Sequence, residues 1–181
     1  MYFKEINHYG DRGLIIDFGI ESSKDISQEI NATIIYLKDL KLPALNTIPS
    51  YNKIVLHFKN TEDKQKSIQT LEIMMKDFRP LDIKRPYKRW NIPTCYEPQY
   101  ALDLERVQKF HDLSIQEIIN LHTKKIYYNY YIGFMPGFPY LGEISSKLIT
   151  PRLSSPRVRI PARSVGIAKE HTCIYPKVSP G

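Results

Sequence analysis

The chain has 181 residues, of which 42% are hydrophobic and 12% aromatic, and this composition is typical of a globular protein with enough apolar material for a core. Its formal charge of +7 comes from 26 basic residues scattered among 19 acidic ones, so no charge block indicates a nucleic-acid partner. No apolar run approaches the roughly 20 residues of a membrane span and the start lacks the pattern of a signal peptide, so we expect a cytoplasmic protein with no membrane partner.

The first half of the chain alternates between strand-like and helix-like patterns. β-forming residues at 2–9 and 14–18 flank a loop with a glycine at each end, which predicts a hairpin. Apolar residues at helical spacing predict a helix from about Ser27 to Leu40. Residues 53–58 alternate as a strand with one apolar face.

A second helix is predicted to complete this half. Thr61 is the expected N-cap, because acidic residues follow it in the first turn. The apolar stripe of this helix consists of Ile68, Leu71, Met75 and Phe78. The resulting order, ββαβ(β)α with one optional strand, is typical of an α+β sandwich.

A proline-rich stretch marks the predicted domain boundary. Residues 79–93, RPLDIKRPYKRWNIP, combine three prolines with five basic residues. We therefore expect an N-terminal domain at 1–85 and a second domain at 86–181. A solvated linker explains the basic residues better than a nucleic-acid site, because no further basic and aromatic repeats follow.

The second half is predicted to begin with two short helices. Asp103 is a candidate cap for the first of them. That helix carries the apolar residues Leu104, Val107 and Phe110. A capping-box pattern at residues 114–117 opens a helix that reaches about His122. From Lys125 onward, short β-prone pieces alternate with prolines and glycines, which favours a small barrel or sandwich.

The stretch YYIGFMPGFPYLG at residues 130–142 holds five aromatic rings and no charge. Pro136 and Gly137 predict the centre of a type II turn, because proline presets one φ and glycine takes the positive φ that follows. Two interpretations are open. The rings either fill the core of a buried hairpin or form a stiff apolar wall beside a ligand or a partner protein.

Arginines are concentrated in TPRLSSPRVRIPARSVGIA, residues 150–168. Alternation along a short strand would place Arg157 and Arg159 on one face and Val158 on the other, toward a core. Two adjacent guanidinium groups suit a carboxylate or a phosphate, and Arg152 and Arg163 are near enough in sequence to join them. Solvated arginines that pair with local carboxylates are the alternative.

The motifs of several common enzyme classes are absent, among them the phosphate-binding loop, the dinucleotide fingerprint and H-E-x-x-H. Cys95 and Cys173 lie far apart without metal-ligand spacing, so we expect no metal site. Ser164 lacks the strand, turn and helix that surround a nucleophile elbow. His122, at a predicted helix end, is a candidate acid or base, although an isolated histidine is more often structural.

Longer motifs resemble one family. They are GDRGLIIDFG (10–19), IPSY (48–51), IPTCY (92–96), LHT (121–123), YIGFMPGFPYLG (131–142), TPRLSSPRVRIPA (150–162), SVGIA (164–168) and IYPKVSPG (174–181). Together these motifs resemble the B subunit of the bacterial ATP-dependent 5-oxoprolinase, a family also called allophanate hydrolase subunit 1 or the Kip inhibitor family. The resemblance covers nearly the whole chain.

The resemblance implies an N-terminal α+β domain followed by a cyclophilin-like β-barrel domain. It also implies two partners, the C and A subunits of the same enzyme, with which the chain would cleave 5-oxoproline to glutamate, with ATP as co-substrate. In that setting we expect His122 to transfer protons and Arg152, Arg157 and Arg159 to bind the anionic substrate. The residues expected at the ligand wall or partner interface are Phe134, Pro136, Gly137, Phe138, Tyr140 and Pro161.

Two further expectations concern the end of the chain and an alternative role. The sequence stops at Gly181, where relatives continue with further strands, so we expect the barrel to be incomplete at its C-terminal end. The alternative function is that of a binding protein similar to the Kip inhibitor, which docks on a sensor histidine kinase and inhibits it. In either case the isolated chain is expected to be inactive as an enzyme.

Overall fold

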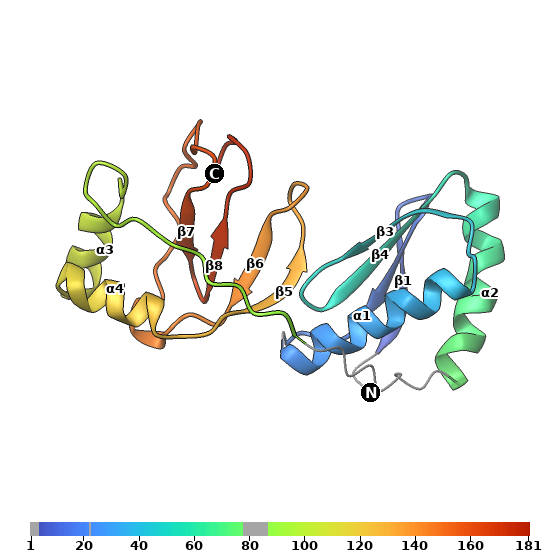
Figure 1. The fold of residues 1–181 in the computed structure, drawn as a ribbon. Coiled ribbons are helices and arrows are strands. Elements are labelled where there is room, and N and C mark those ends of the chain that lie inside the picture. The colour runs from blue at the N-terminus through green and yellow to red at the C-terminus, as the bar shows by residue number, and fades with distance from the viewer. Residues whose placement is uncertain (1–3, 22, 78–86) are drawn as a thin grey trace. The chain divides into compact units, whose positions relative to one another are not determined.

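The computed structural model describes residues 4–21, 23–77 and 87–181. The chain divides into two compact units, residues 1–86 and 87–181 (Figure 1). The boundary that the proline-rich stretch predicts, between residues 85 and 86, lies outside the described residues, as does Phe78. Of the helices within the described ranges, none is long and apolar enough to cross a lipid bilayer.

The first unit packs two helices against an antiparallel sheet. Strands β1 (Glu5–Tyr9), β2 (Gly13–Asp17), β3 (Ala44–Pro49) and β4 (Lys53–Phe58) lie in the order β1-β2-β4-β3. The helices are α1 (Lys24–Asp39) and α2 (Thr61–Asp77). Alternate residues of β2 and β4 meet both helices in one core, formed by Leu14, Ile16, Phe18, Ile26, Ile30, Leu37, Ile54, Leu56, Phe58, Leu71 and Met74. The optional strand of the predicted order is present as β3.

Helix α1 begins earlier than its apolar periodicity predicts. The hydroxyl oxygen of Ser23 accepts the backbone N–H of Ile26 at 3.1 Å, so Ser23 is the N-cap and the helix starts at Lys24 rather than near Ser27. A serine at this position satisfies a backbone donor that the helix itself leaves unpaired. Lys24 and Asp25 therefore extend the helix on the N-terminal side of Ile26, the first buried residue of its apolar stripe.

The predicted cap of α2 was wrong by one residue. The side-chain oxygen of Asn60, not that of Thr61, accepts a backbone N–H, from Asp63 at 2.8 Å. Asparagine caps at least as well as threonine, and its position immediately before the helix allows this bond. In the apolar stripe, Leu71 is fully buried and Ile68 packs against the core.

The second unit contains two short helices and a second antiparallel sheet. Helices α3 (Leu104–His111) and α4 (Ile115–Thr123) precede strands β5 (Tyr128–Ile132), β6 (Pro139–Gly142), β7 (Val165–Ala168) and β8 (His171–Ile174), with a 3-10 turn at η1 (Ser146–Leu148). The strands lie in the order β5-β6-β8-β7. The described strands form an open sheet rather than the closed barrel that the family resemblance implies.

A separate core joins the helices of this unit to its sheet. Its buried members are Leu104, Val107, Ile118, Ile144 and Leu148, and Tyr127 and Ile167 pack against them. Phe110, predicted on the apolar face of α3, is instead 55% exposed. Its ring packs edge-on against the neighbouring His111, with centroids 4.8 Å apart, rather than into the core.

One of the two predicted caps in this unit is confirmed. Ser114 and Glu117 form a reciprocal capping box at the start of α4. Asp103 makes no capping hydrogen bond at the start of α3. Its carboxylate instead accepts a hydrogen bond from the guanidinium group of Arg157 at 2.5 Å, so a partner 54 residues away displaces the local cap.

Candidate functional site

A β-bulge directs several tyrosines to one face of the second sheet. The register between β5 and β6 shifts between Asn129 and Tyr131, so Tyr130 is the extra residue. The ring of Tyr130 lies edge-on to those of Tyr128 and His171, with centroids 5.3 and 5.9 Å apart. Tyr131 stacks on Tyr140 at 4.4 Å, with the ring planes 12° from parallel.

Two glycines make room for these rings. A Cβ atom on Gly142 would lie 2.7 Å from the ring of Tyr130 and 2.9 Å from that of His171. A Cβ atom on Gly133 would lie 2.7 Å from the ring of Tyr131. Because these distances are shorter than carbon atoms approach, no residue with a side chain fits at either position unless the rings move.

The loop between β5 and β6 contains the predicted type II turn. The backbone N–H of Phe138 donates to the carbonyl of Met135 at 3.1 Å, and Gly137 between them has a φ of +84°. Pro136 and Gly137 therefore occupy the central positions that proline and glycine favour. A second, tighter turn precedes it, because Met135 donates to the carbonyl of Gly133 at 2.7 Å.

The two interpretations of the aromatic stretch each apply to different rings. Phe138 is only 4% exposed and contacts the rings of Phe134, Tyr140 and Tyr175, with centroids 5.3, 5.1 and 5.0 Å apart. Phe138 is therefore the buried centre of a group of rings formed by Phe134, Phe138, Tyr140 and Tyr175, which we call the aromatic cluster. Phe134 is 62% exposed. Pro136, Gly137 and Pro161 are exposed as well, and Tyr140 is half-buried.

His122 is the centre of a buried hydrogen-bonded chain. Its side chain lies 2.5 Å from the hydroxyl of Tyr96 through Nδ1 and 3.1 Å from the hydroxyl of Thr172 through Nε2. Thr172 donates its own proton to the carbonyl of Gly166 at 2.9 Å, so it must accept from Nε2. In the neutral imidazole Nδ1 is then the acceptor, and the Tyr96 hydroxyl is the donor.

Burial lowers the pKa of His122 below its ordinary value and so favours the neutral imidazole. Both ring nitrogens already have partners inside the fold, and Tyr96, half-buried, is the member that solvent reaches. Sequence reasoning did not single out Tyr96 or Thr172, because they are 26 and 50 residues from His122.

The predicted strand that would align the arginines is absent from the structure. Residues 157–159 form no strand, and Val158, expected in a core, is 89% exposed. The prolines at 156 and 161 interrupt strand pairing, and the backbone of Arg157 instead exchanges two hydrogen bonds with Gly181, at 2.6 and 2.9 Å. Alternation therefore does not place Arg157 beside Arg159.

The arginines have different neighbours. The guanidinium group of Arg157 is paired with Asp103 at the start of α3, whereas Arg159 and Arg152 are exposed. Burial raises the pKa of Cys173 to about 11 and also raises the pKa of Tyr175. The positive charge of Arg152 has a smaller, opposite effect on both pKa values. Arg152 therefore lies near the aromatic cluster of the second sheet.

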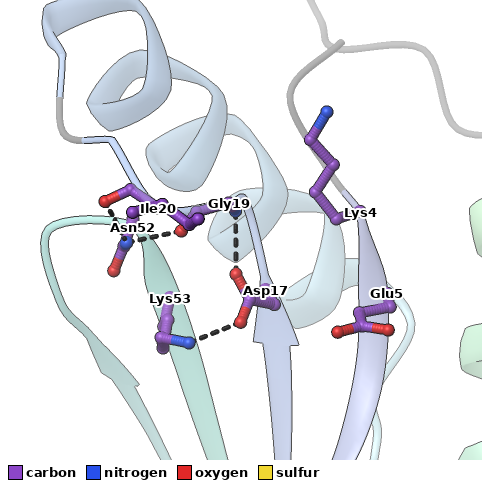
Figure 2. Close-up of a pocket in the computed structure, with 7 residues that line it drawn as sticks. All are labelled: Lys4, Glu5, Asp17, Gly19, Ile20, Asn52 and Lys53. Carbon is purple, nitrogen blue, oxygen red and sulfur yellow. Dashed lines mark hydrogen bonds and ion pairs between the residues drawn. The ribbon is translucent and has the colours of Figure 1, made fainter.

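The first unit has a pocket of about 390 Å³ at the end of its sheet (Figure 2). Its lining comprises Lys4, Glu5, Asp17, Gly19, Ile20, Asn52 and Lys53. Lys53 forms an ion pair with Asp17, and Gly19 donates to the same carboxylate at 2.8 Å. Burial alone would raise the pKa of Asp17, but these two partners lower it below its usual value. The principal charges of the pocket thus neutralise one another.

Across the described ranges, no group of three or more histidine, cysteine or acidic side chains is placed to hold a metal ion. Cys95 is exposed and Cys173 half-buried, and neither forms a disulfide.

Similar proteins identify the family. The family described as carboxyltransferase domain, subdomain C and D, matches residues 4–181. The chain is 34% identical over 188 residues to the B subunit of 5-oxoprolinase from Bacillus subtilis (strain 168), and this alignment covers 98% of this chain and 78% of the relative. It is 36% identical over 137 residues to the Haemophilus influenzae protein of the same name, covering 76% of this chain and 61% of the relative.

Solved structures agree with this assignment. The crystal structure of TTHA0988 in one crystal form matches with a TM-score of 0.79 at 31% identity, covering 94% of this chain and 33% of that chain. A second crystal form gives a TM-score of 0.76 at 32% identity. The chain therefore spans about a third of the length of TTHA0988. On these matches, the chain belongs to the family of the carboxyltransferase domain, subdomain C and D, and is a relative of the 5-oxoprolinase B subunits.

Proposed function

We propose that this chain is the B subunit of an ATP-dependent 5-oxoprolinase that acts with the A and C subunits in the cytoplasm. The complex would open the ring amide of 5-oxoproline to give L-glutamate, with ATP hydrolysis supplying the driving force. The observation that carries the proposal is the family match across residues 4–181 together with relatives named for the B subunit of 5-oxoprolinase. The open second sheet would then form part of a cyclophilin-like barrel.

The proposal assigns substrate binding to the aromatic face of the second sheet. 5-Oxoproline is a small ring that carries a carboxylate, so it suits a site that combines flat aromatic surface with a guanidinium group. Tyr140 and Tyr175 offer such rings, and Arg152 acts electrostatically on Tyr175. Arg159 is exposed and does not share the Asp103 pairing that engages Arg157. We therefore propose that Arg152 and Arg159, rather than Arg157, bind the anion.

Proton transfer, if this unit contributes it, would run through Tyr96. His122 cannot reach a ligand directly, because Tyr96 and Thr172 already occupy its two ring nitrogens. The hydroxyl of Tyr96 is 2.5 Å from Nδ1, so His122 would accept the Tyr96 proton once a bound ligand stabilises the phenolate, since burial alone raises the pKa of Tyr96 and lowers that of His122. His122 is then a positioning and proton-accepting partner of Tyr96 in the proposed reaction.

The test is reconstitution with the cognate A and C subunits. We expect ATP-dependent release of glutamate from 5-oxoproline by the three-component mixture and none by this chain alone, because the chain has no phosphate-binding loop. Omitting this chain should abolish the activity. A mixture of the other two components that is equally active without it would overturn the proposal.

The exposed ring of Phe134 supports a second candidate, a binding protein similar to the Kip inhibitor that acts on a sensor histidine kinase. Aromatic side chains of this kind commonly anchor protein interfaces. Autophosphorylation of the cognate kinase separates the candidates. The inhibitor proposal requires that stoichiometric amounts of this chain lower the rate, whereas the oxoprolinase proposal requires no effect.

A further inference from the structure

The loop that carries Arg152 has little backbone bonding of its own. It follows Thr150, whose carbonyl accepts the backbone N–H of Lys169 at 2.7 Å. In the part of the chain that the structure describes, residues 151–156 make no backbone–backbone hydrogen bond. Sheet pairing therefore does not fix the backbone from which the Arg152 side chain projects, and other contacts have to do so.

Two side chains of α3 supply such contacts. Nη2 of Arg106 donates to the carbonyl of Pro151 at 3.1 Å. Nε2 of His111 lies 3.0 Å from the hydroxyl of Thr150, which donates its own proton to a backbone carbonyl at 2.9 Å, so His111 is the donor of this bond. Thr150 is 1% exposed. Helix α3 thus holds both residues that precede Arg152.

The bond from Arg106 acts on the peptide unit that leads into Arg152. The carbonyl of Pro151 and the nitrogen of Arg152 belong to one planar group, so they turn together. The ring of Pro151 already fixes its φ, which leaves ψ as the only soft dihedral of that residue. A hydrogen bond to the Pro151 carbonyl restricts this ψ. The position of the Arg152 Cα atom therefore depends directly on Arg106.

Folding stability does not account for arginine at position 106. Its Nε atom is buried and has no hydrogen-bond partner among the described residues. An unpaired buried donor costs about as much free energy as one hydrogen bond from a charged group contributes. The contact between Arg106 and Pro151 therefore adds little net stability. What it does provide is a fixed backbone next to Arg152.

A fixed backbone matters for an arginine that binds an anion. Arg152 is exposed and acts electrostatically on Cys173 and Tyr175, which places its charge beside the aromatic cluster. A guanidinium group that is already oriented loses less conformational entropy when it pairs with a carboxylate. Resting on the proposed function, we propose that Arg106 is a positioning residue that holds Arg152 in place for anion binding, through the carbonyl of Pro151.

A double-variant cycle separates positioning from folding. Arg106→Met removes the donor to Pro151 together with the unpaired Nε, Arg152→Met removes the proposed anion-binding group, and the double variant removes both. Arg106→Lys keeps a charged donor, which suffices for a bond to one carbonyl oxygen. Lys109→Met is the matched control, because Lys109 is an exposed basic residue of the same helix.

The measurement uses the complex reconstituted with the A and C subunits. Initial rates of glutamate release give kcat and the KM values for 5-oxoproline and for ATP, and thermal melting of each free chain reports on folding. Arg152→Met should raise one of the two KM values by about tenfold or more. Arg106→Met should raise the same KM by about threefold or more, with kcat unchanged and a melting temperature close to that of the wild type.

The double variant gives the decisive comparison. Its KM should be no higher than that of Arg152→Met, because Arg106 acts only through Arg152. Arg106→Lys and Lys109→Met should behave as the wild type does.

Three results would overturn the positioning role and leave the proposed function intact. They are single-variant effects on KM that multiply in the double variant, unchanged KM values in Arg152→Met, and an Arg106→Met chain that fails to fold or melts lower with an unchanged KM. A wild-type complex that releases no glutamate would instead overturn the proposed function, and the role of Arg106 with it.

Discussion

The hydroxyl of Tyr96 donates to Nδ1 of His122 across 2.5 Å, which joins an extended segment to the last turn of α4. His122 in turn donates to Thr172 on β8 across 3.1 Å, and Thr172 donates to Gly166 on β7. One buried imidazole thus connects a loop, a helix and two strands of the second unit. Burial favours the neutral form of this ring, in which Nδ1 accepts and Nε2 donates.

The neutral state of His122 predicts a pH dependence of stability. Burial lowers its pKa below the ordinary value of 6.5, so near that pH the unfolded chain binds a proton that the folded chain does not. The free energy of unfolding contributed by this group is fully present above about pH 6.5 and is lost as the pH falls through the lowered pKa. We expect urea denaturation to show a smaller loss of stability between about pH 7.5 and pH 5 in His122→Gln than in the wild type.

His171 provides a comparison for this measurement. Burial lowers its pKa as well, although Glu170 and Glu143 act in the opposite direction. His171→Gln should therefore also show a smaller loss of stability at low pH than the wild type, but it leaves the Tyr96–His122–Thr172 chain in place. Identical pH dependence in His122→Gln and the wild type would show that His122 does not titrate differently in the folded and unfolded chains.

Thr172→Val should destabilise the second unit through its polar group alone. Thr172 is 2% exposed, and valine has nearly the same shape but can neither accept from His122 nor donate to Gly166. Leaving such buried groups without partners costs about 1–3 kcal/mol. Thr172→Ser, which keeps the hydroxyl, should retain the bonds and lose only a methyl group. Denaturant unfolding compares the two variants, and equal stability of Thr172→Val and the wild type would contradict the assigned bonds.

The features that sequence predicts well in this protein are local. The capping box of Ser114 and Glu117 and the turn at Pro136 and Gly137 both depend on residues within four positions of one another. The same holds for the alternation of β4, whose residues 53–58 have the predicted extent. Short-range hydrogen bonds and fixed φ values determine such features almost independently of the rest of the chain.

The features that sequence does not predict depend on distant partners. Arg157 was expected on a strand, but its backbone pairs with Gly181 and its side chain with Asp103. No pattern around Arg157 contains information about residues 24 or 54 positions away. The bulge at Tyr130 cannot be predicted from neighbouring residues either, because it is defined by how β5 pairs with β6. The candidate site therefore required the structure, although most of its residues lie in motifs visible in the sequence.

Gly142→Ala should test how closely the tyrosines lie on the second sheet. The added Cβ atom would lie 2.7 Å from the Tyr130 ring and 2.9 Å from the His171 ring, so both rings must move. Overpacking of this kind typically costs about 1–3 kcal/mol. Gly166→Ala on β7 is the milder comparison, since its Cβ atom would lie 3.1 Å from the Cys173 sulfur. A smaller loss of unfolding free energy in Gly142→Ala than in Gly166→Ala would contradict the observed packing.

The ion pair between Arg157 and Asp103 should contribute little to stability. The two side chains are 35% and 41% exposed, and ion pairs open to solvent are usually worth about 0–1 kcal/mol. We expect Arg157→Ala and Asp103→Ala each to change the free energy of unfolding by less than about 1 kcal/mol, with a coupling energy in the double variant no larger than that. A coupling well above this range would show that the pair is more shielded from water than its exposure indicates.

The arginines also allow the proposed anion site to be located. Lysine in place of arginine keeps the charge but loses the planar, two-pronged donor that a carboxylate prefers. In the reconstituted three-component complex, Arg152→Lys and Arg159→Lys should therefore weaken binding of 5-oxoproline, or of the nucleotide if that is the anion held there. Arg157→Lys should leave both affinities unchanged, because Asp103 already occupies the guanidinium group of Arg157. Thermal melts of the free chains control for folding. Affinity lost in Arg157→Lys but retained in Arg152→Lys would reverse the assignment and place the anion at the start of α3, where it would compete with Asp103.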